Sequence, residues 1–188
     1  MVNVVGNWFA ENLGGWRLDI SKQKEGEGFA IVLMSPEDSN VKINIMDVGQ
    51  GINQVLPLVV RGFLGHPGQK NSNGIDIIEQ PELHIHPAAH GSLAELIVNT
   101  AKHENGCFII ETHSENFILR MRRLIAEGQL DCKNVIIYWV NNEEISGTFL
   151  KPIFIDNEGE VDYWPKGVFT EDYQELIAIR KAQKNPYE

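Results

Sequence analysis

Short β-type runs alternate with amphipathic segments in the middle of this 188-residue chain, and this alternation restricts its fold more than any other feature. The runs 75–78, 107–110 and 134–140 are rich in Ile, Val and Phe, as buried strands are. Apolar residues recur at three- and four-residue steps in 88–103 and again after Ser114, a plausible helix N-cap. Strand, helix, strand, helix, strand predicts right-handed crossovers. The expected fold is therefore α/β, with a mainly parallel sheet and flanking helices.

The segments on either side of this core have different patterns. Residues 17–34 and 41–46 alternate apolar and polar side chains around polar turns, which predicts an antiparallel lead-in. Residues 52–63 repeat at helical spacing, and Pro57 predicts a mild kink just past the first turn of that helix. We expect three regions: a strand-rich lead-in at 1–46, a core at 47–145 and a C-terminal extension with a helical tail at 146–188.

Composition excludes several classes of protein. A formal charge of −10 argues against broad nucleic-acid affinity, because phosphate neutralisation needs clustered Lys and Arg. The one basic cluster, Arg120, Arg122 and Arg123, is typical of a solvated helix face. Cys107 and Cys132 flank apolar segments and are expected to be buried free thiols in a reducing compartment. No segment approaches the roughly 20 apolar residues of a membrane span, and no basic region precedes an apolar run at the N-terminus. A cytoplasmic protein is expected.

Polar side chains follow two successive strands of the predicted sheet. Glu79 and Gln80 follow strand 75–78, and Glu111, Thr112 and His113 follow strand 107–110. Because the carboxyl ends of parallel strands share one edge of a sheet, we expect these side chains to converge in a crevice. The residue types allow a metal site, an acid/base pair or a nucleotide-sensing loop.

Four motifs, taken in order, resemble one family. The stretch "IDIIEQPELHIHP" resembles the Walker B strand and D-loop of ABC-type ATPases of the structural-maintenance-of-chromosomes, RecF and overcoming-lysogenization-defect group. The stretch "FIIETHSENFILRMRRLI" resembles their switch-histidine segment, and "DVGQGINQVLPLVV" is similar to their signature-helix entry. The tail "VDYWPKGVFTEDYQE" resembles the extension of the subgroup carrying the domain of unknown function 3696. This resemblance implies a P-loop NTPase fold with ATP and Mg²⁺ as cofactors.

The resemblance also implies residue roles. Glu79 matches the acid that holds Mg²⁺ through water, and His113 matches the switch residue that bonds the γ-phosphate or the attacking water. Gly49, Gly51 and Gln54 match the signature, whose backbone amides face a nucleotide on the opposing subunit. A zinc site built from His84 and His86 with Glu79, Glu82 and His113 is the metal alternative, although the family explains both histidines as D-loop residues.

Two features depart from the family pattern. Gln80 stands where many of these ATPases have a catalytic glutamate, and an amide can orient a water but cannot take its proton. Glu82 or the substrate phosphate would then have to replace that base. The sequence also contains no GxxxxGK[ST] phosphate loop. In this family that loop lies in an N-terminal half, so the chain looks like a C-terminal half, whether a truncation or one partner of a split pair.

The expected function is the signature, Walker B and switch half of an ATP-driven dimerisation engine. Its implied partners are a phosphate-loop half, a second subunit in a homodimer or hetero-oligomer, and a nuclease, in DNA repair or phage defence. Nucleic acid would be contacted only indirectly. Two alternatives remain: a non-catalytic interaction subunit without turnover, and a metal-dependent phosphoesterase built on His84, His86 and His113.

Overall fold

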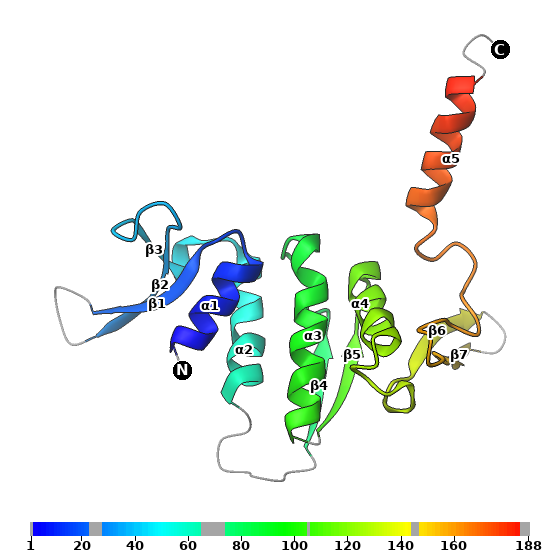
Figure 1. The fold of residues 1–188 in the computed structure, drawn as a ribbon, viewed down its shortest axis with the longest axis horizontal. Coiled ribbons are helices and arrows are strands. Elements are labelled where there is room, and N and C mark those ends of the chain that lie inside the picture. The colour runs from blue at the N-terminus through cyan, green and yellow to red at the C-terminus, as the bar shows by residue number, and fades with distance from the viewer. Residues whose placement is uncertain (1, 23–27, 65–73, 105, 144–146, 185–188) are drawn as a thin grey trace. The chain divides into compact units, whose positions relative to one another are not determined.

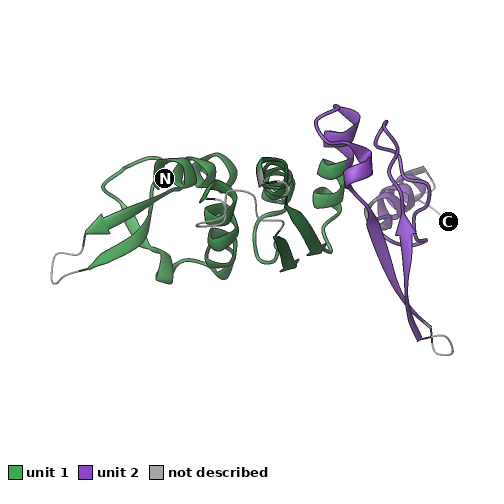
Figure 2. Cartoon of the chain, turned by 90° about the horizontal axis from the view of Figure 1, so that it is seen from below, with its two compact units in different colours: residues 1–121 green, residues 122–188 purple. Residues whose placement is uncertain are grey.

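The computed structural model describes residues 2–22, 28–64, 74–104, 106–143 and 147–184, which form two compact units, residues 1–121 and 122–188 (Figures 1 and 2). The elements of the first unit are α1 (Val2–Asn12), β1 (Arg17–Lys22), β2 (Phe29–Met34), β3 (Lys42–Asn44), η1 (Ile45–Asp47), α2 (Gln50–Leu64), β4 (Ile75–Glu79), α3 (Pro87–Glu104) and β5 (Cys107–Glu111). Helix α4 (Glu115–Ala126) crosses the unit boundary. The second unit contains η2 (Cys132–Asn134), β6 (Ile137–Glu143), β7 (Gly147–Ile153) and α5 (Glu171–Lys184).

The N-terminal part of the first unit is the expected antiparallel lead-in with an additional helix. Strands β1, β2 and β3 pair antiparallel in that order, with Leu18 opposite Leu33. Helix α1 packs against β1 so closely that a Cβ at Gly6 would lie less than 3.0 Å from the Leu18 carbonyl oxygen. The sequence did not predict α1, although Phe9 on this helix is completely buried.

Helices α2 and α3 supply most of the core. Helix α2 begins two residues earlier than predicted and includes Pro57, while α3 matches the predicted helix to within one residue at each end. Side chains from α1, α2, α3 and α4 meet in one apolar cluster. Its buried members include Phe9, Val55, Val59, Leu93, Ala94 and Phe117.

Strands β4 and β5 form a parallel pair that presents one covered face and one bare face. The pairing runs from Ile75 opposite Cys107 to Glu79 opposite Glu111. Side chains on one face, including Ile78 and Ile110, pack against the core. The side chains on the other face alternate with them and are exposed; they are Ile75, Ile77, Glu79, Cys107, Ile109 and Glu111. The fold class is confirmed as mixed α/β, although the parallel sheet has only two strands in the described part of the chain.

The exposed thiol of Cys107 corrects one sequence expectation. Neither cysteine forms a disulfide, as expected, but Cys107 is exposed and Cys132 is half-buried. The reason is the bare face: Cys107 begins β5 on that side of the sheet, where no other described residue covers it. A run of apolar residues indicates a strand but does not say that both of its faces are covered.

The second unit is organised around an antiparallel hairpin. Strand β6 pairs with β7 from Ile137 opposite Ile153 to Glu143 opposite Gly147, rather than extending the parallel sheet as the alternation had suggested. Within this unit the Arg122 guanidinium donates hydrogen bonds to the Gly159 carbonyl at 2.7 Å and to the Glu160 carboxylate at 2.9 Å.

The basic cluster at 120–123 is held by internal ion pairs. Arg120 pairs with Glu95 in the first unit, and Arg123 pairs with Glu127 one turn along at 2.7 Å. Together with the Arg122 contacts, these pairs assign all three arginines a structural role.

Helix α4 begins at the predicted cap. The Ser114 hydroxyl accepts a hydrogen bond from the Phe117 amide at 3.1 Å, which satisfies an N–H that has no partner inside the helix. Gly128, at φ 69°, follows the C-terminus and its amide bonds the Ile125 carbonyl, as a C-terminal cap does. No helix of the described residues combines the length and apolar character needed to cross a bilayer.

Replacing Ser114 with alanine should lower the free energy of unfolding of the chain by about 1–2 kcal/mol, because the cap is buried and also bonds His90. Ser114→Thr keeps the hydroxyl and is the matched control. Urea titration followed by circular dichroism measures both variants. Equal stabilities for Ser114→Ala and the unmodified chain would show that the cap contributes nothing.

Candidate functional site

The candidate site lies at the carboxyl ends of β4 and β5. Glu79 and Glu111 are register partners at the ends of these strands, and both are exposed on the bare face. The Gln80 amide donates a hydrogen bond to the Glu111 carbonyl at 2.8 Å, so the pairing extends one residue past β4. Two carboxylates at adjacent strand ends are oxygen donors of the kind that Mg²⁺ binds, directly or through water.

Gln80 and His113 meet around the Glu111 carboxylate. The Gln80 side-chain amide lies 3.5 Å from Glu111 Oε1, and His113 Nε2 lies 3.7 Å from the same oxygen. Gln80 has a left-handed backbone, at φ 44°, which is uncommon for a residue with a side chain and is typical of functional turns. Glu79 ends β4, Gln80 follows it and His113 follows β5, so the three residues lie at one sheet edge, as the sequence predicted.

Glu82 is buried beneath this cluster, with 7% of its surface exposed. Its Oε1 accepts hydrogen bonds from the Thr112 hydroxyl at 2.7 Å and from the His113 amide at 2.8 Å. The segment after β4 is thereby tied to the segment after β5. With Oε1 occupied by two donors, Glu82 holds the His113 segment in this structure, and a role as replacement base gains no support from the geometry.

The predicted signature residues lie at the start of α2. Gly49 is exposed, with nothing within 4 Å of a Cβ placed there, and Gln54 is exposed on the helix. Gly51 is different, because it lies inside the first turn of α2 and is buried. A Cβ on Gly51 would lie less than 3.0 Å from the carbonyl group of His84. The helical repeat at 52–63 had predicted that Gly49 and Gly51 both precede the helix, and this is wrong for Gly51, since α2 begins at Gln50.

His84 and His86 remain exposed in the turn that connects β4 to α3. His84 has a left-handed backbone at φ 63°, and His86 Nδ1 accepts a hydrogen bond from the Ala88 amide at 3.2 Å. Among the described residues, no three His, Cys, Asp or Glu side chains are grouped as metal ligands would be. The zinc site and the phosphoesterase built on it therefore gain no support.

The sequence did not single out His90, which supports the site from α3. Its Nδ1 lies 2.7 Å from the Ser114 hydroxyl and its Nε2 lies 3.2 Å from the Ile85 carbonyl. A carbonyl only accepts, so Nε2 carries the proton and Nδ1 accepts from the Ser114 hydroxyl. The sequence could not predict these two hydrogen bonds. Ser114 is distant from His90 in the sequence, and the position of the Ile85 carbonyl depends on the conformation of the turn before α3.

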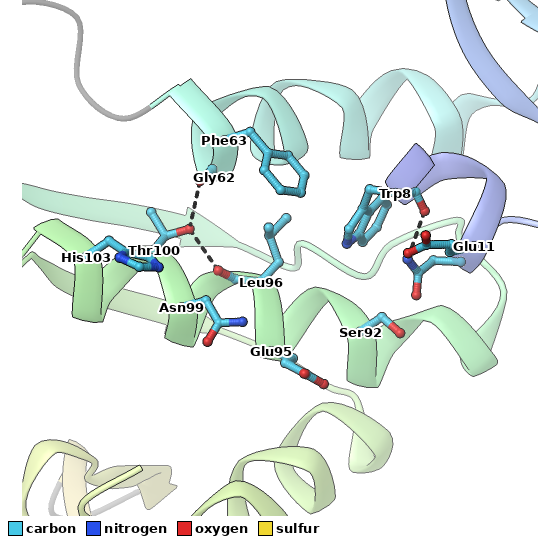
Figure 3. A pocket seen from close by; sticks show the side chains of 11 residues that line it. Trp8, Glu11, Gly62, Phe63, Ser92, Glu95, Leu96, Asn99, Thr100 and His103 are labelled. Atoms are coloured by element: carbon cyan, nitrogen blue, oxygen red, sulfur yellow. Dashed lines mark hydrogen bonds between the residues drawn. The ribbon is translucent and has the colours of Figure 1, made fainter. Parts of the chain in front are cut away.

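A separate pocket of about 540 Å³ lies among α1, α2 and α3 (Figure 3). Trp8, Phe63 and Leu96 form its apolar wall, and the Thr100 hydroxyl bonds the Leu96 carbonyl at 2.8 Å beside it (Figure 3). None of the candidate site residues lines it. The pocket is therefore distinct from the strand-end site, and most of its other lining side chains are polar: Glu11, Asn12, Ser92, Glu95, Asn99 and His103.

Comparison with known proteins agrees with this α/β fold. The family model described as "AAA ATPase domain" matches residues 8–118, more than half of the chain. No curated protein sequence matches. One similar solved structure, from a study of ATP-driven dimerization and DNA-stimulated activation of SMC ATPases, has a TM-score of 0.52 at 16% identity, covering 95% of this chain and 90% of that one. Another, an SMC head bound to the C-terminal winged-helix domain of ScpA, has a TM-score of 0.53 at 13% identity, covering 82% of this chain and 44% of that one.

The fold is the mixed α/β fold of solved SMC ATPase heads. The chain belongs to the AAA ATPase domain family. The solved neighbours show that its fold is that of SMC heads, which confirms the resemblance to the ABC-type group. Family membership implies ATP as the ligand, with Mg²⁺ as its usual companion. The exposed carboxylates of Glu79 and Glu111 suit that cation.

Proposed function

We propose that this chain supplies the Walker B, switch and signature groups of an ATP-hydrolysing site that a phosphate-loop segment completes. The observation that carries this proposal is the placement of Glu79, Gln80 and His113 at the carboxyl ends of two adjacent parallel strands. In α/β proteins this edge is where nucleotides bind. Glu79 would hold Mg²⁺, Gln80 would orient the attacking water and His113 would sense the γ-phosphate.

The bare face of β4 and β5 supports the proposal that a further segment packs here. Ile75, Ile77 and Ile109 are 63%, 72% and 54% exposed on that face. Parallel sheets in α/β proteins are covered on both faces, because isoleucine-rich strands lose stabilisation when one face contacts water. A segment carrying the phosphate loop and its following helix would cover these isoleucines and bring its amides to the edge that holds Glu79.

Dimerisation follows from the position of the signature residues. Gly49 is exposed at the N-terminus of α2, where backbone amides favour an anion. A γ-phosphate held by an opposing subunit would meet Gly49 and Gln54. The solved SMC ATPases are described as undergoing ATP-driven dimerization, and we propose the same cycle here, with a nuclease partner in DNA repair or phage defence.

Gln80 favours a second candidate function, an interaction subunit that binds nucleotide without fast turnover. An amide cannot accept the proton of the attacking water, so closure of the dimer would persist after ATP binds. Single-turnover measurements with the completed site distinguish the two functions. A hydrolysing ATPase releases phosphate, whereas an interaction subunit without turnover keeps its ATP intact.

Titration calorimetry with Mg-ATP tests the proposal. The 188-residue chain alone should bind with a dissociation constant on the order of millimolar, equivalent to about 4 kcal/mol, because most phosphate contacts of such sites come from the loop and its lysine. Turnover by the chain alone should be undetectable, and addition of a phosphate-loop half should restore binding. A micromolar constant for the chain alone would mean that other residues hold the nucleotide, and the proposal would fail.

A further inference from the structure

We propose that Glu82 is a positioning residue for His113, and that the turn 83–85 links it mechanically to Gly51 at the start of the signature helix. The inference rests on the proposed function for what His113 does, and on this structure alone for how His113 is held. Glu82, Thr112 and the His113 amide are called the Glu82 clamp below.

The clamp concentrates two strong hydrogen bonds on one oxygen. The Thr112 hydroxyl lies 2.7 Å from Glu82 Oε1 and the His113 amide lies 2.8 Å from it. Bonds to an ionised acceptor are about twice as strong as bonds between neutral groups. Oε2 is buried and has no hydrogen-bond partner among the described residues, so the burial of this carboxylate is only half compensated. A buried acceptor that is only half satisfied calls for an explanation, and we infer that Glu82 fixes the position of its two donors.

A second connection runs parallel to the clamp. His90 donates to the Ile85 carbonyl and accepts from the Ser114 hydroxyl, which itself accepts from the Phe117 amide. The turn after β4 is therefore joined to both sides of His113, through Glu82 on one side and through His90 and Ser114 on the other. The exposed imidazole of His113 emerges from a backbone that is held at two points.

The N-terminus of α2 presses against the same turn. A Cβ at Gly51 would lie less than 3.0 Å from the carbonyl oxygen and carbon of His84 and 3.0 Å from the Ile85 nitrogen. Because backbone and not a flexible side chain forms this contact, any shift of α2 toward the turn must move residues 84 and 85. They follow Glu82 in the same turn, and the Ile85 carbonyl accepts a hydrogen bond from His90. The contact thus joins the helix whose N-terminus is proposed to meet one nucleotide to the turn that holds the histidine proposed to sense the other.

Amide hydrogen exchange of the isolated 188-residue chain, resolved by NMR, tests the clamp without requiring ATPase activity. Glu82→Met removes the acceptor at similar size and should speed exchange of the His113 amide by about tenfold or more. Glu82→Gln keeps an acceptor oxygen but loses the charge, and should give an intermediate rate. An unchanged rate in Glu82→Met, or equal rates in the two variants, would overturn the clamp.

Thr112→Val and Thr112→Ser provide a second pair if Glu82→Met does not fold. Valine matches the shape of threonine and removes the donor to Glu82, whereas serine keeps it. We expect faster exchange of the His113 amide in Thr112→Val and a rate near that of the unmodified chain in Thr112→Ser. Equal rates in these two variants would show that the hydroxyl does not hold the segment.

Gly51→Ala and Gly49→Ala test the connection to α2. Alanine at 51 must displace the His84 carbonyl and should change both the exchange rate and the ring chemical shifts of His113. Alanine at 49 meets nothing within 4 Å and should leave both unchanged. If Gly51→Ala leaves His113 unaffected while the chain stays folded, the turn does not transmit displacement and the connection fails.

Kinetics of the completed ATPase give the last readout. Glu82→Met should lower kcat with little change in KM, and Glu82→Gln should restore much of the lost kcat, since a positioning residue acts on the reacting geometry and not on ground-state binding. A rise in KM alone would contradict the inference. Failure of the ATPase to assemble would count against the proposed function only, because the exchange experiments do not depend on it.

Discussion

Replacing Glu79 with glutamine in the completed enzyme should lower magnesium-dependent ATP turnover by about 10- to 100-fold, the usual cost of disturbing a group that holds a catalytic metal through water. The amide keeps the size of the side chain and removes the charge that attracts the cation. Steady-state phosphate release over a range of Mg²⁺ concentrations measures the effect, and the loss should shrink as Mg²⁺ rises.

Two variants make this result specific. Glu115→Gln removes the same charge from the exposed first turn of α4 and should leave turnover nearly unchanged. Gln80→Glu places a proton acceptor at the position proposed to orient the attacking water and should raise turnover or leave it unchanged. If Glu79→Gln and Glu115→Gln behaved alike, Glu79 would have no special relation to the metal.

Replacing Ile77 with aspartate should weaken assembly with a phosphate-loop half by about 100-fold or more. Ile77 is the most exposed isoleucine of the bare face, and covering it would bury an unpaired charge at a cost of several kcal/mol. The isolated chain should lose no more than about 1 kcal/mol of stability, because the side chain already contacts water. Binding of the two halves is measured by calorimetry, and stability by urea titration.

Ile20→Asp is the matched control for this experiment. Ile20 is 46% exposed on β1, in a sheet that has no proposed part in completing the site. It should assemble like the unmodified chain. If Ile77→Asp assembled equally well, another surface would have to receive the phosphate-loop half.

Sequence periodicity predicted the strands and helices that build the site, but it did not predict which other segments pack against them. Strands β4 and β5 and helices α3 and α4 appear within about two residues of their predicted positions, because each has its own apolar repeat and its own cap or turn. The strand-end residues Glu79, Gln80 and His113 could be placed together for the same reason. Parallel strands separated by one helix put their carboxyl ends at the same edge.

Contacts that depend on tertiary packing could not be read in this way. Helix α1 was not predicted, and the burial of Glu82 and Gly51 depends on which segments come to lie against the turn 83–85. The sequence predicted β6 as a strand but not β7, and the antiparallel pairing of the two depends on that second strand. The exposure of Cys107 depends on what covers the sheet, which no local pattern records.

The row of uncovered isoleucines on β4 and β5 has a consequence for how the protein must be made. Isoleucine-rich strands with one uncovered face are prone to associate with other copies of the chain until that face is covered. The charge of −10 opposes such clustering but does not shield the strands. If the proposed phosphate-loop segment is made beside this chain, from the same message or the same ribosome, the strands are exposed to water for a shorter time. Unequal production of the two parts would leave the excess of this chain to chaperones and proteases.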